Sequence, residues 1–130
     1  MQLSAAVQAS QKIIPQAYLS AVDRYNVMAY DLAYDASAPY DAAVNYLESW
    51  ADYGVPRSKL LMGVPFYGKA GTSWANSNAL SYGSIVSQYA SAHGGAFPAP
   101  AADSATVNGV TWGYNGVETC LLYTSDAADE

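Results

Sequence analysis

Two short apolar runs, each ending in aromatic and polar residues, dominate the pattern of the chain. They are Val27–Leu32 (VMAYDL) and Lys59–Lys69 (KLLMGVPFYGK). Between them, Asp41–Tyr53 carries apolar residues at helical spacing and is followed by glycine and proline, which end helices. This order predicts a βαβ unit, in which a helix joins two parallel strands. Functional residues in such units gather at the carboxyl ends of the strands, here Tyr30–Asp31 and Tyr67–Lys69.

The strands of this unit are expected to be short. Arg24–Tyr30 is the first, and Asp31 falls just past its end, where a carboxylate can reach a ligand. Lys59–Val64 is the second, and Gly68 beyond it is expected to let the backbone turn close to a ligand. Met1–Ser10 is expected to hold a further strand followed by a loop. The predicted fold class is therefore α/β.

Residues 71–119 have a different character and are predicted to form an insertion after the second strand. Trp74 stands alone among small polar residues at its start. Ser81–Ala92 has apolar residues at helical spacing and predicts a helix. Thr106–Val117 predicts a β-hairpin, with Asn108–Gly109 in its turn.

The last eleven residues, 120–130 (CLLYTSDAADE), resemble the in-frame translation of a transposase sequencing adapter. We expect this segment to be a non-native tail and exclude it from predictions of the fold. Without its three acidic residues the acidic count falls from 11 to 8, and the formal net charge changes from -6 to -3. The single cysteine, Cys120, then says nothing about redox compartment. The sequence is expected to be a piece of a longer protein.

Composition narrows the classes of function. Five Lys and Arg residues form no basic patch, so nucleic acid is not an expected partner. The sequence has no apolar run of the roughly 20 residues that span a bilayer, so no membrane partner is expected. Its N-terminus shows no signal-peptide pattern. Twelve of its residues are tyrosines, whose flat faces and hydroxyls suit sugar rings, although they equally suit a protein core. The pattern contains no metal-ligand cluster or phosphate-binding loop, and no cofactor is predicted.

The segments MAYDLA (28–33) and GVPRSKLLMGVPFYGKA (54–70) resemble two motifs of the glycoside hydrolase family 18 chitinases. In that family, Met-x-Tyr-Asp lies on the sixth barrel strand and Gly-Val-Pro-Phe-Tyr-Gly-Arg on the seventh. The resemblance implies a partial (β/α)8 TIM barrel, about strands five to seven, with part of an α+β insertion. Residues 1–70 would then be the partial catalytic domain and 71–119 the insertion subdomain of helix plus hairpin.

The resemblance also implies roles for individual residues. The family hydrolyses β-1,4-linked N-acetylglucosamine polymers, such as chitin, by substrate-assisted retaining hydrolysis. By motif position Tyr30 would hold the acetamido group, and Asp31 would bond the sugar and tune the nearby acid. Met28 would line the floor of the subsite, and Tyr67 and Lys69 would contact sugar hydroxyls. Lys69 replaces the family's arginine, which exchanges a two-pronged donor for a point charge.

Other features of the family leave alternatives open. Trp74 is either a sugar platform or part of the core of the insertion. The family's catalytic glutamic acid lies in an Asp-x-x-Asp-x-Asp-x-Glu motif that this sequence lacks, and Glu48 and Glu118 match no catalytic position. The resemblance implies a secreted parent enzyme. Because this chain lacks the acid motif, we expect it to be an inactive part of that enzyme. The alternative is a chitin-binding lectin of the same fold, and enzymes acting on peptidoglycan or glycoprotein glycans are a third possibility.

Overall fold

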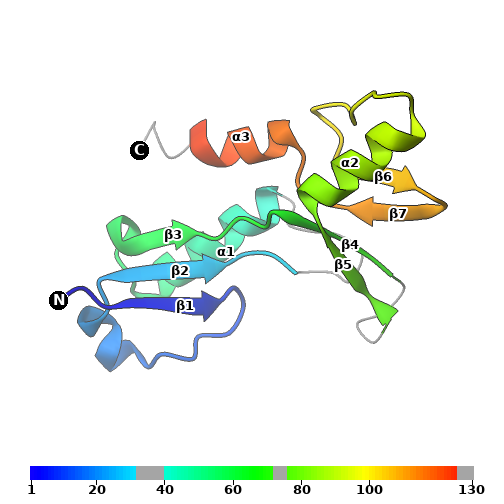
Figure 1. Cartoon of the computed structure of the whole chain (residues 1–130). Helices are drawn as coiled ribbons and strands as arrows, with labels where there is room; N and C mark the ends of the chain where they lie inside the picture. Colours follow the sequence, from blue (N-terminus) through cyan, green and yellow to red (C-terminus); the bar gives the residue numbers. More distant parts are fainter. Residues whose placement is uncertain (32–39, 72–75, 126–130) are drawn as a thin grey trace. The chain divides into compact units, whose positions relative to one another are not determined.

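The computed structural model describes residues 1–31, 40–71 and 76–125 (Figure 1). These residues belong to two compact units, each with its own sheet. The elements in chain order are β1 (Ser4–Gln8), η1 (Gln16–Ala21), β2 (Arg24–Met28), α1 (Tyr40–Tyr53), η2 (Arg57–Lys59), β3 (Leu60–Met62), β4 (Tyr67–Ala70), β5 (Asn78–Ser81), α2 (Tyr82–Ala92), β6 (Ser104–Val107), β7 (Val110–Gly113) and α3 (Val117–Ser125).

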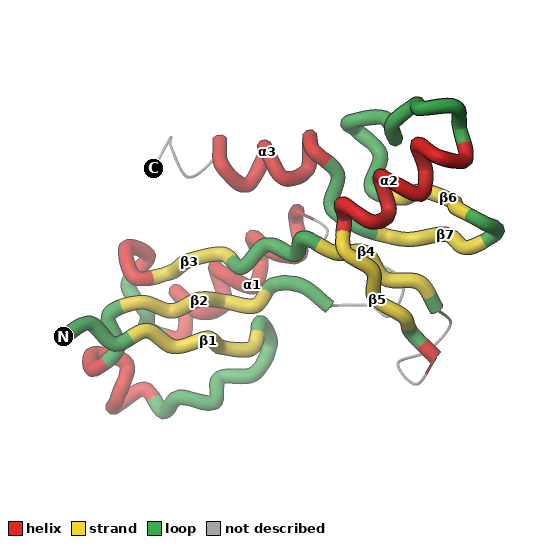
Figure 2. Tube along the Cα trace, in the orientation of Figure 1, coloured by secondary structure: helices red, strands yellow, loops and turns green. Residues whose placement is uncertain are grey.

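The first unit comprises residues 1–30 and 41–64 and contains a parallel sheet with strand order β1-β2-β3. Val27, in the middle strand, pairs with a residue of each neighbour. Helix α1 lies along one face of the sheet (Figures 1 and 2). The chain thus passes from β2 through α1 to the parallel strand β3, which confirms the predicted βαβ unit.

Alternation along β2 separates a buried face from a more open one. Tyr25, Val27 and Ala29 are each fully buried. Asn26 is exposed and Met28 is half-buried on the opposite face. The buried face is the one that α1 covers, because the Tyr25 ring lies 6.0 Å from the ring of Trp50 in that helix.

Trp50 anchors α1 to the sheet. Its side chain is completely buried, and its indole N–H donates to the carbonyl of Gln8 at 3.0 Å. The ammonium of Lys12 lies 4.6 Å from the centroid of the same ring. Ala43 is the other buried residue of the helix, whereas Val44 and Leu47, which helical spacing also favours, are half-buried. A large aromatic ring with a bonded N–H therefore carries most of this contact.

The second unit comprises residues 31–40 and 65–130 and contains an antiparallel sheet with order β5-β4-β7-β6. Ile85 on α2 packs with Ala105 and Tyr114 in its core. The predicted helix and hairpin are both confirmed, at α2 and at β6–β7. Asn108 and Gly109 have φ angles of 51° and 76°, which the tight hairpin turn requires.

The structure corrects the prediction at the second apolar run, which divides between two strands of different sheets. β3 ends at Met62, and β4 begins at Tyr67 and pairs antiparallel with β5. A Cβ atom on Gly68 would lie 2.5 Å from Cδ1 of Ile85 and 2.9 Å from the carbonyl oxygen of Gly113. The expectation that Gly68 turns the backbone toward a ligand was therefore wrong, since close packing within the second unit accounts for this glycine.

Helix α3 runs through the boundary of the segment expected to be a non-native tail. Val117, which the hairpin prediction included, is the first residue of this helix. The amide of the buried Asn115 donates to the hydroxyl of Tyr123 at 2.9 Å. Neither α3 nor any other described helix has the length and apolar character needed to cross a membrane.

Two buried tyrosines differ in the partner of the hydroxyl group. Tyr25 donates to the carbonyl of Leu19 at 2.8 Å, whereas the hydroxyl of Tyr114 has no hydrogen-bond partner among the described residues. Tyr25→Phe should lower the free energy of unfolding of the first unit by about 1 kcal/mol, because Leu19 loses its donor. Tyr114→Phe should leave the second unit equally or more stable. Urea unfolding followed by hydrogen-exchange mass spectrometry reports on each unit, and equal losses would contradict this assignment.

The phenol of Tyr114 also predicts a pH dependence. Burial, together with the nearby Tyr82 and Asp103, raises the pKa of Tyr114 to about 12. An unfolded tyrosine ionises near pH 10, whereas Tyr114 stays neutral in the folded chain to about pH 12. Ionisation therefore favours the unfolded state as the pH rises from about 10 to 12, and the free energy of unfolding falls across this window. Tyr114→Phe should therefore reduce the loss of stability across this window. Urea titrations at several pH values, read by circular dichroism, measure it, and an unchanged loss would refute the role of Tyr114.

Candidate functional site

Asp31 lies shortly after the end of β2 and has an unusual backbone conformation. Its φ angle is 59°, in the left-handed region that most side chains avoid and that Asp tolerates better than most. Residues held in this region are often found at functional sites. The backbone at Asp31 therefore supports the prediction that this carboxylate has a special role.

One oxygen of the Asp31 carboxylate has two partners on β4. The hydroxyl of Tyr67 donates to Oδ1 at 2.6 Å, and the ammonium of Lys69 lies 3.1 Å from the same atom. Residues two apart on a strand point to the same face, so β4 presents both groups together. Gly68 and Ala70, on the other face of β4, are buried. The structure thus brings together three of the predicted site residues within the second unit.

The ion pair of this cluster is partly shielded from water. The side chain of Lys69 is 12% exposed and that of Asp31 is 37% exposed. Shielding strengthens such a pair relative to one on the open surface, and hydrogen bonds to an ionised acceptor are short and strong. The carboxylate therefore fixes a phenol and an ammonium group side by side. The ammonium group can donate to a hydroxyl oxygen, and the phenol oxygen, which donates its proton to Asp31, can accept from a hydroxyl group; both are bonds that sugar recognition uses.

The other predicted residues have different positions. Met28 is the last residue of β2 and is half-buried in the first unit. Tyr30, also in the first unit, places its ring against Gly63, where a Cβ atom would lie 2.9 Å from Cε1 of the ring. Trp74 lies outside the described residues. Sequence patterns did not single out Gly63. Its only signal there is that it is a glycine inside the predicted strand Lys59–Val64, and in the structure it directly follows β3.

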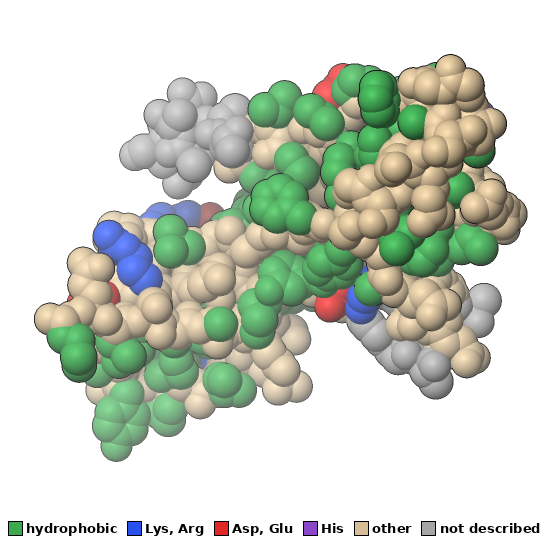
Figure 3. Space-filling model, viewed as in Figure 1, with side chains coloured by type: hydrophobic (Ala, Val, Ile, Leu, Met, Phe, Trp, Pro, Cys, Tyr) green, Lys and Arg blue, Asp and Glu red, His purple; other side chains and the backbone are tan. Residues whose placement is uncertain are grey.

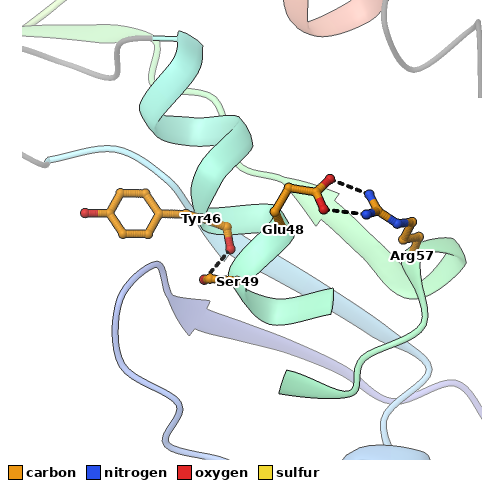
Figure 4. Close-up of polar contacts among 4 residues, drawn as sticks. All are labelled: Tyr46, Glu48, Ser49 and Arg57. Atoms are coloured by element: carbon orange, nitrogen blue, oxygen red, sulfur yellow. Dashed lines mark hydrogen bonds and ion pairs between the residues drawn. The ribbon is translucent and has the colours of Figure 1, made fainter. Parts of the chain in front are cut away.

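Glu48 shows the geometry of a structural carboxylate. It lies on α1, is exposed, and forms two hydrogen bonds with the guanidinium of Arg57 (Figure 4). The hydrogen bond from Arg57 lowers the pKa of Glu48, with burial acting weakly in the opposite direction. A general acid needs a raised pKa so that it holds its proton near neutral pH. Glu48 is therefore unsuited to protonating a leaving group.

Charged side chains form small, separate groups on the face of the molecule drawn in Figure 3. Most of the described part of that face consists of hydrophobic side chains and of backbone and uncharged side-chain atoms. Among the described residues, no three His, Cys, Asp or Glu side chains lie together in a way that could hold a metal ion. The Asp31 cluster therefore offers a ligand directed hydrogen-bonding groups, and the residues that the structure describes on the face in Figure 3 form no broad charged patch.

Comparison with known proteins identifies the class. The sequence pattern of glycosyl hydrolases family 18 matches residues 1–124, and the chain belongs to this family. No curated protein sequence gives a significant match. Solved structures with the same fold, and with probability 1.00, include family 18 chitinases.

Three of these solved structures are informative. The family 18 chitinase ChiB of Flavobacterium johnsoniae is 25% identical, with a TM-score of 0.77 over 99% of this chain and 41% of its own. A mutant plant class V chitinase of Cycas revoluta in complex with (GlcNAc)3 is 25% identical, with a TM-score of 0.74 over 98% and 47%. The chitinase-like agglutinin RobpsCRA of Robinia pseudoacacia is 25% identical, with a TM-score of 0.72 over 99% and 47%. The chain thus spans less than half the length of each.

Asp31 allows a test that separates its charge from its backbone conformation. Asp31→Asn removes the charge but keeps an acceptor and tolerates the left-handed φ angle. Asp31→Ala loses the acceptor and also places alanine in that region, at a further cost of about 1 to 2 kcal/mol. We expect the stability of the second unit to fall from Asp to Asn to Ala in urea unfolding.

The control for this series is Asp52, which is exposed on α1. Alanine favours helices more than asparagine does, so Asp52→Ala should be more stable than Asp52→Asn. If Asp31→Ala were also more stable than Asp31→Asn, the left-handed backbone at Asp31 would impose no special cost on alanine.

Proposed function

We propose that this chain forms part of the sugar-binding cleft of a family 18 glycosidase that acts on chitin. The shared Oδ1 atom of Asp31, bonded to Tyr67 and near Lys69, is the observation that carries this proposal. Family membership and the structural likeness to chitinases, one of them in complex with (GlcNAc)3, support it. In this assignment β1, β2 and β3 correspond to about strands five to seven of a (β/α)8 barrel. The parent protein would be secreted, where polymeric chitin is accessible.

The proposed reaction is substrate-assisted retaining hydrolysis of β-1,4-linked N-acetylglucosamine. The acetamido oxygen of the sugar attacks the anomeric carbon, and an acid protonates the leaving oxygen. Tyr30 holds the acetamido group, which keeps the attacking oxygen in position. Asp31 accepts a hydrogen bond from the sugar and influences the acid. Met28 lies under the sugar as the floor of its subsite.

The remaining residues extend the cleft. Tyr67 and Lys69 contact sugar hydroxyls, Lys69 as a donor and the phenol oxygen of Tyr67 as an acceptor, and Trp74 offers a flat face to a sugar ring. Lys69 offers one mobile point charge where an arginine would offer a planar fork, so its subsite holds the sugar less rigidly. The Asp-x-x-Asp-x-Asp-x-Glu motif that carries the family's acid does not occur in these 130 residues, so we propose that the acid lies outside them. The chain alone then binds sugar without hydrolysing it.

A chitin-binding lectin is the second candidate. The likeness to the Robinia pseudoacacia agglutinin supports it as directly as the likeness to the chitinases supports an enzyme. Both candidates use the same contacts for binding and differ in the acid. The residue at the end of the fourth barrel strand in the longer coding sequence distinguishes them, because glutamate there indicates an enzyme and glutamine or leucine a lectin.

Calorimetric titration of the folded chain with (GlcNAc)4 tests the proposal. We expect (GlcNAc)4 to bind more tightly than cellotetraose, which has no acetamido groups, and to remain uncleaved. Tyr67→Phe should weaken binding about tenfold, because it removes the phenol oxygen that contacts the sugar and the hydrogen bond that holds the Asp31 carboxylate in place. Tyr18→Phe is the matched control, since Tyr18 is 65% exposed on η1. A folded chain that ignores (GlcNAc)4, or binds cellotetraose equally, would refute the proposal.

A further inference from the structure

Gly63 lies directly after β3 and contacts residues of β2 and the segment that follows it. Its backbone N–H donates to the carbonyl oxygen of Val27 at 2.8 Å. A Cβ atom at this position would lie 2.9 Å from Cε1 of Tyr30, 3.1 Å from the Val27 oxygen and 3.3 Å from Oδ1 of Asn26. Close approach of a ring and of backbone thus occupies the space that any side chain would need.

The conformation of Gly63 does not explain why it is glycine. Five glycines of the described chain have positive φ angles, and Gly63 is not one of them. Lack of space is the remaining structural reason, and the ring of Tyr30 is its nearest cause. The requirement for glycine at position 63 therefore depends on the position of the Tyr30 ring.

We propose that Gly63 is a positioning residue that seats the ring of Tyr30 against the backbone at the end of β3. The inference rests on the proposed function, in which the phenol of Tyr30 holds the acetamido group of the substrate. The Val27 carbonyl is fixed by two hydrogen bonds, because it also accepts from the N–H of Ala29 at 2.9 Å. An added methyl group at Gly63 must therefore displace the ring of Tyr30, which is the nearest neighbour at 2.9 Å and belongs to a side chain rather than to the backbone.

The phenol oxygen lies at the far end of that ring, so a displacement of Cε1 moves it as well. A misplacement of about 1 Å can reduce a catalytic rate about 100-fold. A Cβ atom 2.9 Å from Cε1 is closer than real Cβ contacts, so the ring must shift to relieve it. We therefore expect Gly63→Ala to weaken the binding of (GlcNAc)4 about tenfold while the chain stays folded.

The first measurement reports on the ring without any sugar. With 3-fluorotyrosine placed at position 30, the ¹⁹F resonance should shift in Gly63→Ala. Gly83→Ala is the matched control, because a Cβ atom at Gly83 meets nothing within 4 Å. An unchanged resonance in a folded Gly63→Ala chain would overturn the inference. If the resonance shifts in Gly63→Ala but the chain without this substitution does not bind (GlcNAc)4, the positioning of the Tyr30 ring by Gly63 is supported and the proposed function is refuted.

The second measurement is a double-mutant cycle between Gly63 and Tyr30, read by the affinity for (GlcNAc)4. If Gly63 acts through the ring, Gly63→Ala should have no further effect in a Tyr30→Ala chain. An equal loss in both backgrounds would show a merely structural role and reject the inference. Should Gly63→Ala alone unfold the first unit, adding Tyr30→Ala should restore folding, and a failure to restore it would count against the ring as the clashing group.

Discussion

The carbonyl oxygen of Val27 determines how the sheet of the first unit ends at the carboxyl ends of β2 and β3. It accepts the N–H of Gly63 at 2.8 Å and the N–H of Ala29 at 2.9 Å. The first bond joins the end of β2 to the residue after β3, and the second closes a tight turn between residues two apart in sequence. Because both bonds use one atom, the end of the sheet and the direction of the departing chain are fixed together.

Two adjacent residues beyond this turn are held in different ways. The ring of Tyr30 lies against the backbone of Gly63, within the first unit. Asp31 adopts a left-handed φ angle, and its carboxylate is held by Tyr67 and Lys69 of the second unit. An aromatic ring is supported by close packing and a carboxylate by directed bonds, so substitutions at the two positions should have different physical consequences.

Local patterns predicted the parts of the fold that depend on neighbours in sequence. The βαβ unit, α2 and the hairpin at Asn108–Gly109 follow from periodicity and turn residues. β4 and β5 are four residues each, and the alternation of apolar residues along them is too short to predict a strand. Motif position named Asp31, Tyr67 and Lys69, but their shared oxygen atom depends on a backbone angle and a strand pairing that sequence alone does not give.

The place of Met28 follows from the face of β2 on which it lies. Parallel sheets are normally covered on both faces, yet the face of β2 and β3 that α1 leaves uncovered carries Asn26, Met28 and Leu61, of which Leu61 is 49% exposed. In a (β/α)8 barrel the face away from the helices points inward, and Met28 would be its last residue on this strand. The ring of Tyr30 lies near the same face, because the position that a Cβ atom on Gly63 would take is 2.9 Å from Cε1 of Tyr30 and 3.3 Å from Oδ1 of Asn26. The roles proposed for Met28 and Tyr30 in one sugar subsite therefore require this face of the sheet to be the one that points into the barrel.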